Sequence, residues 1–257
     1  MKLYVLENGK LVGPKINSIA DADPAEIQTA PIWSVLIEHS GGYLLLDAGC
    51  HTDADRQHPM IYRDFSMAPE DHILRRIEAL GVAPEEVGTI VLSHLHSDHS
   101  GYIELFPNAA VYVHADELRQ RLGEYERGEA AVGVRDMAYW LEHDIKWEPI
   151  AADEPEREIF PRITILNFGA GHSHGMLGLL VDLPGAGKIL CAGDAVYNRE
   201  NVGPPIRLAG NMVSADGFVM TIERISALAD KLGAQLWYGH DEEQFSSLIK
   251  STEGYYS

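Results

Sequence analysis

His94-Leu95-His96-Ser97-Asp98-His99-Ser100-Gly101 comes just after the apolar run Thr89–Leu92, and it is the most informative stretch of the sequence. It places three imidazoles and a carboxylate within six residues, and such groups are good ligands for borderline divalent metals, zinc above all. Alternation along a strand places His94 and His96 on one face, while a helical turn after the strand directs the aspartate and the third histidine toward a second ion. Four ligands are too many for one catalytic zinc that keeps an open position, so the pattern predicts two metal ions. The alternative is a polar turn or a surface histidine cluster.

The composition of the 257 residues is that of an ordinary globular protein, with 46% hydrophobic and 23% charged residues. Because no linker, repeat or low-complexity tract divides the chain, we expect a single domain over residues 1–257. No apolar run approaches the roughly 18 residues of a membrane span, and the N-terminus lacks the apolar region of a secretory signal. Two cysteines, Cys50 and Cys191, make no disulfide framework, which favours a cytoplasmic location.

The net charge of −19 bears on the partners of the protein. An acidic surface repels nucleic acid and anionic membranes, so we expect neither as a partner. A small-molecule substrate stays compatible, because two divalent ions leave a locally cationic pocket inside an acidic shell. The oligomeric state is left open.

The order of predicted elements indicates the fold class. Asp216–Leu232 has apolar residues at helical spacing and ends at Gly233, and further helices are expected near residues 71–80, 115–122 and 133–143. Apolar and β-branched runs predict strands at Lys2–Leu6, Trp33–Glu38, Tyr43–Asp47, Thr89–Leu92, Ala110–His114, Arg162–Leu166, Leu177–Asp182, Lys188–Cys191 and Gln235–Tyr238. This order favours an α/β fold with two sheets packed face to face and helices on the outside.

Three stretches, 50–69, 122–148 and 197–213, match no element well, apart from the loose helical pattern inside the second. Loops this long in a compact domain are usually functional or disordered. The first carries Tyr62 and Phe65, and apolar groups on a loop beside a metal site suit a substrate pocket. The alternative is that these side chains pack over the sheet edge.

Further ligand candidates follow three later strands. The chain has Gly171-His172 after the strand near 162–166, Gly193-Asp194 after the strand near 188–191, and Gly239-His240 after the last strand. A glycine before each candidate lets the backbones crowd one point. Taken singly, each is more often a surface or turn-capping residue, but their joint occurrence indicates the remainder of a two-metal site.

The cluster H-x-H-x-D-H, followed by Gly-His, Gly-Asp and Gly-His after successive strands, resembles the metallo-β-lactamase superfamily over nearly the whole chain. This resemblance implies a four-layer αβ/βα sandwich, with two mixed sheets, outer helices and metals at the sheet edge. The sequence is more closely similar to the acyl-homoserine-lactone lactonase branch. The motifs in support are Gly193–Asn201, with Tyr197 three residues after Asp194, the Asp-x-Gly turn that ends Leu44–Gly49, and Gly239-His240-Asp241.

The resemblance implies a ligand set, residue by residue. One metal takes His94, His96 and His172, the other takes Asp98, His99 and His240, and Asp194 bridges the two. Zinc is the expected metal, and manganese, cobalt or iron also suit these donors. Asp47 would orient a ligand imidazole, with a turn-capping role as the alternative.

Three positions depart from the family pattern. The usual proline before Gly171-His172 is absent, and Met176 replaces a common histidine, while His174 lies two residues after the ligand. We expect His174 to contact a metal ligand without binding the metal itself, or to lie at the surface. Position 97 is Ser97, where this branch often carries an aromatic residue that touches the substrate, which argues against long-chain acyl-homoserine lactones.

The resemblance implies a metal-dependent hydrolase that opens a lactone ring, as in quorum quenching, by attack of a hydroxide held by the two metals. Tyr197 would donate to the developing oxyanion or the leaving oxygen, and Asp98 would pass a proton to the alkoxide. A core tyrosine is the alternative for Tyr197. A hydrolase of thioesters, amides or phosphodiesters is the first alternative function. A di-iron redox enzyme is disfavoured because His96 stands where that group has a carboxylate, and a binding module is disfavoured because all seven ligand positions are filled.

Overall fold

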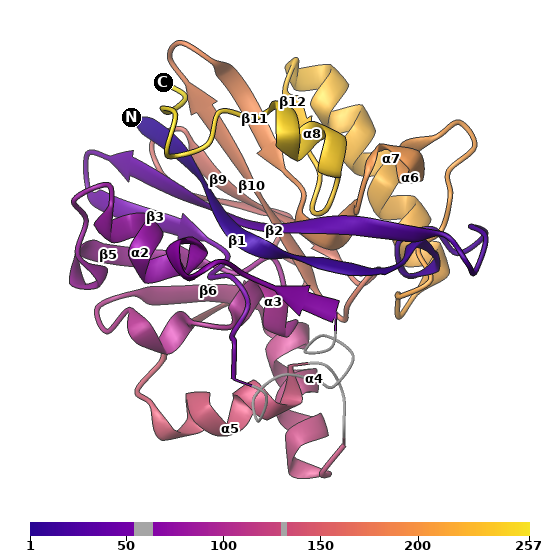
Figure 1. Cartoon of the computed structure of the whole chain (residues 1–257), viewed down its shortest axis with the longest axis horizontal. Coiled ribbons are helices and arrows are strands. Elements are labelled where there is room, and N and C mark those ends of the chain that lie inside the picture. The colour runs from indigo at the N-terminus through magenta and orange to yellow at the C-terminus, as the bar shows by residue number, and fades with distance from the viewer. Residues whose placement is uncertain (54–63, 130–132) are drawn as a thin grey trace.

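Two mixed β-sheets pack face to face with helices on the outside in the computed structural model, which describes residues 1–53, 64–129 and 133–257 (Figure 1). The first sheet has the strand order β4-β1-β2-β3-β5-β6-β7 and the second has the order β12-β11-β10-β9-β8. The predicted sandwich is therefore confirmed.

The bounds of the elements are as follows. The first sheet consists of β1 (Lys2–Pro14), β2 (Ile27–His39), β3 (Gly42–Leu46), β4 (Phe65–Ser66), β5 (Val87–Val91), β6 (Ala110–His114) and β7 (Lys146–Ile150). The second consists of β8 (Glu156–Phe160), β9 (Ile163–Gly169), β10 (Met176–Leu183), β11 (Gly187–Cys191) and β12 (Gln235–Trp237). The helices are α2 (Ile73–Glu78), α3 (Ser97–Ser100), α4 (Ala115–Glu126), α5 (Val134–Glu142), α6 (Arg199–Val202), α7 (Ala215–Leu232) and α8 (Glu242–Ser247). Short 3₁₀ turns are η1 (Lys15–Asn17), η2 (Pro69–Asp71), η3 (Pro84–Glu86), η4 (Ile103–Leu105) and η5 (Gly193–Ala195).

The period-two pattern of β2 explains the layers of the fold. Val35 and Ile37 face the core between the sheets, where they pack with Leu179 and Val181 of β10. Leu36 points to the opposite face, into a second core beneath the helices of the first sheet. Burial of each such side chain contributes about 1.5–3 kcal/mol, so residues on both faces hold the layers together.

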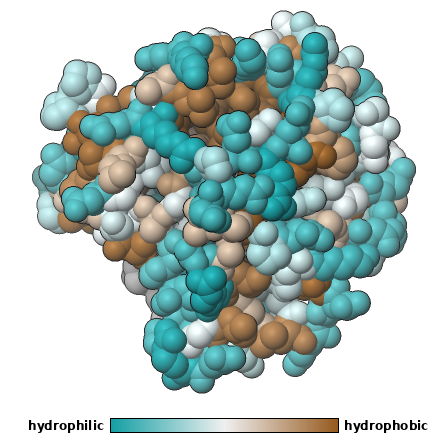
Figure 2. All heavy atoms as spheres, turned by 180° about the vertical axis from the view of Figure 1, so that it is seen from behind, coloured by the Kyte–Doolittle hydropathy of each residue, from teal (hydrophilic) through white to brown (hydrophobic). Residues whose placement is uncertain are grey.

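Helix α7 covers the outer face of the second sheet through a stripe of buried residues that includes Phe218, Ile222 and Ile225. Ser214 caps its first turn by accepting a hydrogen bond from Gly217 N, and Gly233 ends it in a left-handed conformation with φ of 62°. Figure 2 shows hydrophilic side chains over much of the rear face, interrupted by smaller hydrophobic areas. In the described parts of the chain, no helix combines the length and the apolar character needed to cross a bilayer.

The β1–β2 hairpin is longer than the sequence pattern predicts. Its strands pair from Lys2 opposite Glu38 to Pro14 opposite Ile27, with a register shift around Gly9, whose φ is 104°. Figure 1 shows this twisted pair running across the molecule and projecting beyond the sheets. The projecting half lies beside the segments that follow β5 and β11, because Leu11 and Gln28 line one cavity together with His96 and Asp194.

Candidate metal centre

Four of the predicted ligands come from the segment that follows β5 and continues into α3. His94 is completely buried, His96 is the residue before α3, and Asp98 and His99 lie within the helix. The turn is fixed from outside by two backbone hydrogen bonds, in which Asp47 N donates to Val91 O and Ala48 N donates to His99 O. The strand and the short helix thus present both pairs of side chains to one edge of the sheet, as predicted.

The first group of donors consists of His94, His96 and His172. His172 Nε2 lies 3.1 Å from His94 Nε2 and 2.9 Å from His96 Nδ1. His172 Nδ1 must donate to the carbonyl of Asn211, 2.8 Å away, so its Nε2 carries a lone pair. Three imidazole nitrogens that converge in this way suit a shared cation.

The second group consists of Asp98, His99 and His240, with Asp98 Oδ2 at 3.6 Å from Nε2 of each histidine. His240 Nδ1 donates to Pro31 O at 2.8 Å, which leaves the lone pair on Nε2. His99 Nδ1 donates to Asp47 Oδ2, also at 2.8 Å, with the same result. Each outer partner therefore selects the tautomer that a metal ligand needs.

Asp47 supports both groups at once. Its carboxylate accepts hydrogen bonds from the backbone N and the hydroxyl of Ser93, at 2.7 and 2.9 Å. Ser93 Oγ in turn lies 3.1 Å from His94 Nδ1, and it accepts from that nitrogen because its own proton goes to Asp47. Asp47 therefore holds His99 directly and His94 through Ser93, which is more than a turn cap does.

Asp194, in η5, lies between the two groups. Its Oδ2 is 3.5 Å from His172 Nε2, while its Oδ1 is 3.0 Å from His240 Nε2 and 3.4 Å from His99 Nε2. Gly239 is required here, because a Cβ at that position would lie 2.4 Å from Asp194 Oδ1. The two carboxylate oxygens thus face different groups, as expected of a bridging ligand.

Two observations show that these residues fit divalent cations. The seven predicted ligands form three overlapping groups of three residues. Within each group, the nitrogen or oxygen atoms that could bind a metal all lie within 4.8 Å of one another. Within the described residues, the buried atoms His99 Nε2 and Asp194 Oδ1 have no hydrogen-bond partner, although they lie 3.4 Å from each other. A buried polar atom without a partner is costly, and a cation would satisfy both atoms.

The pKa shifts agree with this arrangement. Burial and the neighbouring imidazoles lower the pKa of His94 and His96 well below the ordinary histidine value, which keeps both neutral. Burial opposes ionisation of Asp194, yet His240 and His99 hold its pKa well below the ordinary aspartate value. Burial disfavours the protonated forms of His99 and His240, yet Asp194 raises the pKa of both above the ordinary histidine value, so a metal bound by these two histidines would displace their protons.

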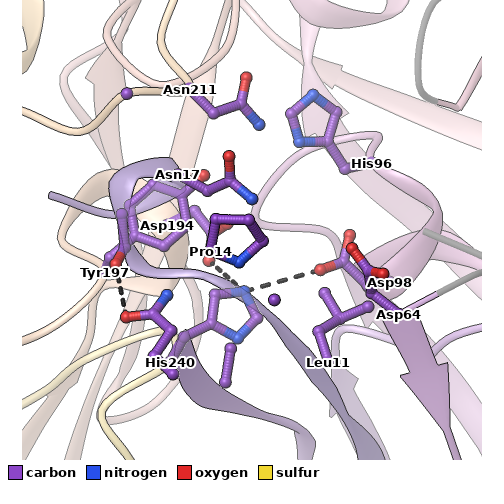
Figure 3. A pocket seen from close by; sticks show the side chains of 15 residues that line it. Leu11, Pro14, Asn17, Asp64, His96, Asp98, Asp194, Tyr197, Asn211 and His240 are labelled. Atoms are coloured by element: carbon purple, nitrogen blue, oxygen red, sulfur yellow. Dashed lines mark hydrogen bonds and ion pairs between the residues drawn. The ribbon is translucent and has the colours of Figure 1, made fainter. Parts of the chain in front are cut away.

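A cavity of about 360 Å³ opens beside the donors, and His96, Asp98, Asp194, Tyr197 and His240 lie in its wall (Figure 3). Other side chains of the wall belong to the projecting hairpin and to nearby loops: Leu11, Pro14, Asn17, Gln28, Ala30, Asp64 and Asn211. The hydroxyl of Tyr197 is 3.0 Å from His172 Nδ1, so this side chain joins the cavity to the first donor group.

The residues predicted for the substrate pocket have other positions. Ser97 and Phe65 do not belong to the cavity wall, since Ser97 is fully buried and Phe65 pairs with Leu11 in the sheet. Tyr62 lies outside the described residues. His174 is a partly exposed side chain 3.9 Å from Glu124, and the contacts described above orient the ligands without it.

Comparison with known proteins agrees with this geometry. The sequence model of the Metallo-beta-lactamase superfamily matches residues 28–226. This chain belongs to that superfamily. N-acyl homoserine lactonase AiiB of Agrobacterium fabrum (strain C58 / ATCC 33970) is 33% identical over 261 aligned positions, which cover 98% of this chain and 93% of the relative. N-acyl homoserine lactonase AiiA of Bacillus thuringiensis subsp. kurstaki is 26% identical, covering 96% and 95%.

Solved structures in this superfamily share the fold across its whole length. An N-acyl homoserine lactone hydrolase with the product N-hexanoyl-L-homoserine bound at its catalytic metal centre matches with a TM-score of 0.84 and 25% identity. The match covers 99% of this chain and 98% of that structure. The resemblance to the lactonase branch of the metallo-β-lactamase superfamily is therefore confirmed.

Proposed function

We propose that this chain is a metal-dependent lactonase that opens the ring of N-acyl homoserine lactones or related small lactones. The observation that carries the proposal is the position of Asp194 between two converging donor groups, in the wall of a cavity that also holds Tyr197. The relatives named N-acyl homoserine lactonase, which align over nearly the whole chain, support the substrate class. A volume of about 360 Å³ is near the lower end of the range of ~300–1,000 Å³ for ligand pockets, which favours a small substrate.

The donor chemistry favours two divalent ions, with zinc as our proposal and manganese, cobalt or iron as alternatives. His94, His96 and His172 would hold one ion, Asp98, His99 and His240 the other, and Asp194 would bridge them. Bound divalent ions supply Lewis acidity, which polarises a carbonyl and lowers the pKa of water. The acidic outer surface leaves a small molecule as the proposed partner, and we propose a cytoplasmic location.

Tyr197 supplies the hydrogen-bond donor in this scheme. Because His172 Nδ1 gives its proton to Asn211 O, it offers the phenol no lone pair, and the hydroxyl hydrogen is left to point into the cavity. Burial raises the pKa of Tyr197 well above the ordinary tyrosine value, so the phenol keeps its proton. It therefore donates to the oxygen on which negative charge develops.

Asp98 is placed to move a proton. Its Oδ2 faces the imidazoles of His99 and His240, and the carboxylate also borders the cavity. The second oxygen of the carboxylate can therefore take the proton that the attacking water loses and pass it to the alkoxide that forms when the ring opens. Ring opening suits this site, because the acyl and alkoxide ends stay tethered beside the donors.

A substrate panel with matched acyl chains tests the proposal. The metal-loaded protein is offered N-hexanoyl homoserine lactone, a hexanoyl thioester, a hexanoyl anilide and an aryl phosphodiester, and products are identified by mass. We expect addition of water to the lactone with a kcat/KM at least a hundredfold above that of the other compounds. Preferred hydrolysis of the thioester, amide or phosphodiester would replace the lactonase proposal with the corresponding alternative.

A further inference from the structure

Glu117, on α4, is a completely buried carboxylate that contacts both ligand-bearing loops. Its Oε1 accepts a hydrogen bond from the backbone N of Leu95 at 3.2 Å, and its Oε2 accepts one from the backbone N of His174 at 3.0 Å. Leu95 lies between the ligands His94 and His96, and His174 lies two residues after His172. One side chain thus connects the two segments that supply the first donor group, His94, His96 and His172, which we call the three-histidine group.

These two segments come from different sheets. The loop of Leu95 follows β5 of the first sheet, whereas the loop of His174 joins β9 to β10 of the second. The distances of 2.9 and 3.1 Å among the three imidazoles depend on how far apart the two sheets hold their loops. A carboxylate that accepts from both backbones fixes this separation.

The surroundings of Glu117 hold the carboxylate in place. Arg121, also buried, donates to Glu117 Oε1 at 3.1 Å and to Glu124 Oε2 at 2.7 Å. The start of α4 also packs closely against the loop of His174, since a Cβ on Gly175 would lie 2.1 Å from Nδ1 of His114, the residue that caps the helix. A buried carboxylate without such partners would be strongly destabilising, and these hydrogen bonds hold the Glu117 carboxylate in one orientation.

We propose that Glu117 is a positioning residue that sets the spacing of the three-histidine group and thereby its affinity for a cation. The inference rests on the metal site of the proposed function and goes beyond its ligands. Outer groups that orient metal ligands typically change metal affinity by about 10–100-fold when they are altered. The group formed by Asp98, His99 and His240 has no contact with Glu117, so its affinity is expected to change less than about threefold.

Three variants of the full chain separate positioning from general stability. Glu117→Gln keeps the size of the side chain but turns an NH₂ group toward a backbone N–H. Glu117→Asp keeps the charge opposite Arg121 but is one methylene too short to reach both amides. Glu124→Gln is the matched control, because it also removes a buried charge beside Arg121. Glu124 lies 3.9 Å from the His174 imidazole, but the backbone amides of both ligand loops donate to Glu117 instead.

The experiment titrates each metal-free variant with Co²⁺, following the visible absorption of the ion and competition with a chromophoric chelator. Unfolding temperatures of the metal-free proteins are measured alongside. We expect both Glu117 variants to bind one of two Co²⁺ ions about 10–100-fold more weakly, with an altered absorption band, and the control to bind both as the unmodified protein does.

Equal weakening of both ions, no weakening, or the same loss in Glu124→Gln would overturn the proposal. Failure of both Glu117 variants to fold would also overturn it, because the residue would then serve folding rather than spacing. The outcome is separate from the lactonase proposal: a protein that binds two Co²⁺ ions but opens no lactone contradicts the function and leaves this inference to be decided by the titration.

Discussion

Replacement of Tyr197 by phenylalanine removes one hydroxyl from the cavity and leaves the ring in place. Tyr197 is 7% exposed, and its ring packs against the imidazoles of His172 and His240, so the aromatic contacts survive the change. The hydrogen bonds from His172 to Asn211 and from His240 to Pro31 also survive, and with them the orientation of both ligands. We therefore expect the bound metal to be unchanged.

The effect on turnover follows from one lost hydrogen bond to a developing oxyanion. A hydrogen bond to a charged group is worth about 1.5–3 kcal/mol. At about 1.36 kcal/mol per factor of ten, this predicts a decrease in kcat of roughly ten- to a hundredfold. KM should change little, because the bond strengthens only as charge develops in the transition state.

The assay follows proton release from a lactone in weak buffer with an indicator dye, and metal content is measured by atomic emission. Tyr4→Phe is a suitable control, since the Tyr4 hydroxyl contacts Glu38 near the other end of β1. A kcat within twofold of the unmodified protein would refute the role of Tyr197 as donor. Loss of metal in the Tyr197 variant would instead show that the hydroxyl acts through His172.

Three further predictions concern metal affinity and stability. Asp47→Asn weakens the hydrogen bonds that orient His99 and Ser93, so we expect the metal affinity to fall about 10–100-fold. Competition with a chelator measures this affinity, and an unchanged value would contradict the role of Asp47. Gly175→Ala introduces a Cβ 2.1 Å from His114 Nδ1, so we expect the free energy of unfolding to fall by about 1–3 kcal/mol, measured as a lower Tm. Gly88→Ala is its control, because no atom lies near the added Cβ, and we expect a far smaller loss of stability. When the free metal concentration is a hundred times the Kd, each bound ion should add about 2.7 kcal/mol to the free energy of unfolding, and removal of both ions should abolish this contribution. For a chain of this size that lowers the Tm by roughly 10–20 °C in calorimetry, and an equal Tm with and without metal would contradict a site coupled to folding.

The sequence predicts best those elements whose pattern is local. Helix α7 begins and ends within a residue of the predicted range, because its apolar stripe and Gly233 are both readable in the chain. The outer half of the β1–β2 hairpin was missed, since Leu11 and Gln28 alternate with exposed Val12 and Ile27 and bury no face against a core. Strand β8 is absent from the predicted strands, because three charged residues open it and interrupt the apolar pattern.

The same distinction applies to the site. The seven candidate ligands could be found because each follows a strand and lies beside a glycine or another ligand in the sequence. The cavity wall could not be found, because Leu11 and Asn211 reach it only through the tertiary course of the hairpin and the loop before α7. Ser93 was the exception that could have been recognised, since a hydroxyl directly before His94 is a plausible partner for an imidazole.

The most direct test of a two-metal lactonase is proton release measured against metal content. Chelator-treated protein receives zinc in steps from zero to three equivalents, and ring opening of N-hexanoyl homoserine lactone is followed at each step. We predict negligible activity without metal and a rise that reaches its plateau at two equivalents per chain. Undiminished activity in the metal-free protein, or no activity with two ions bound, would contradict the assignment of a dinuclear lactonase.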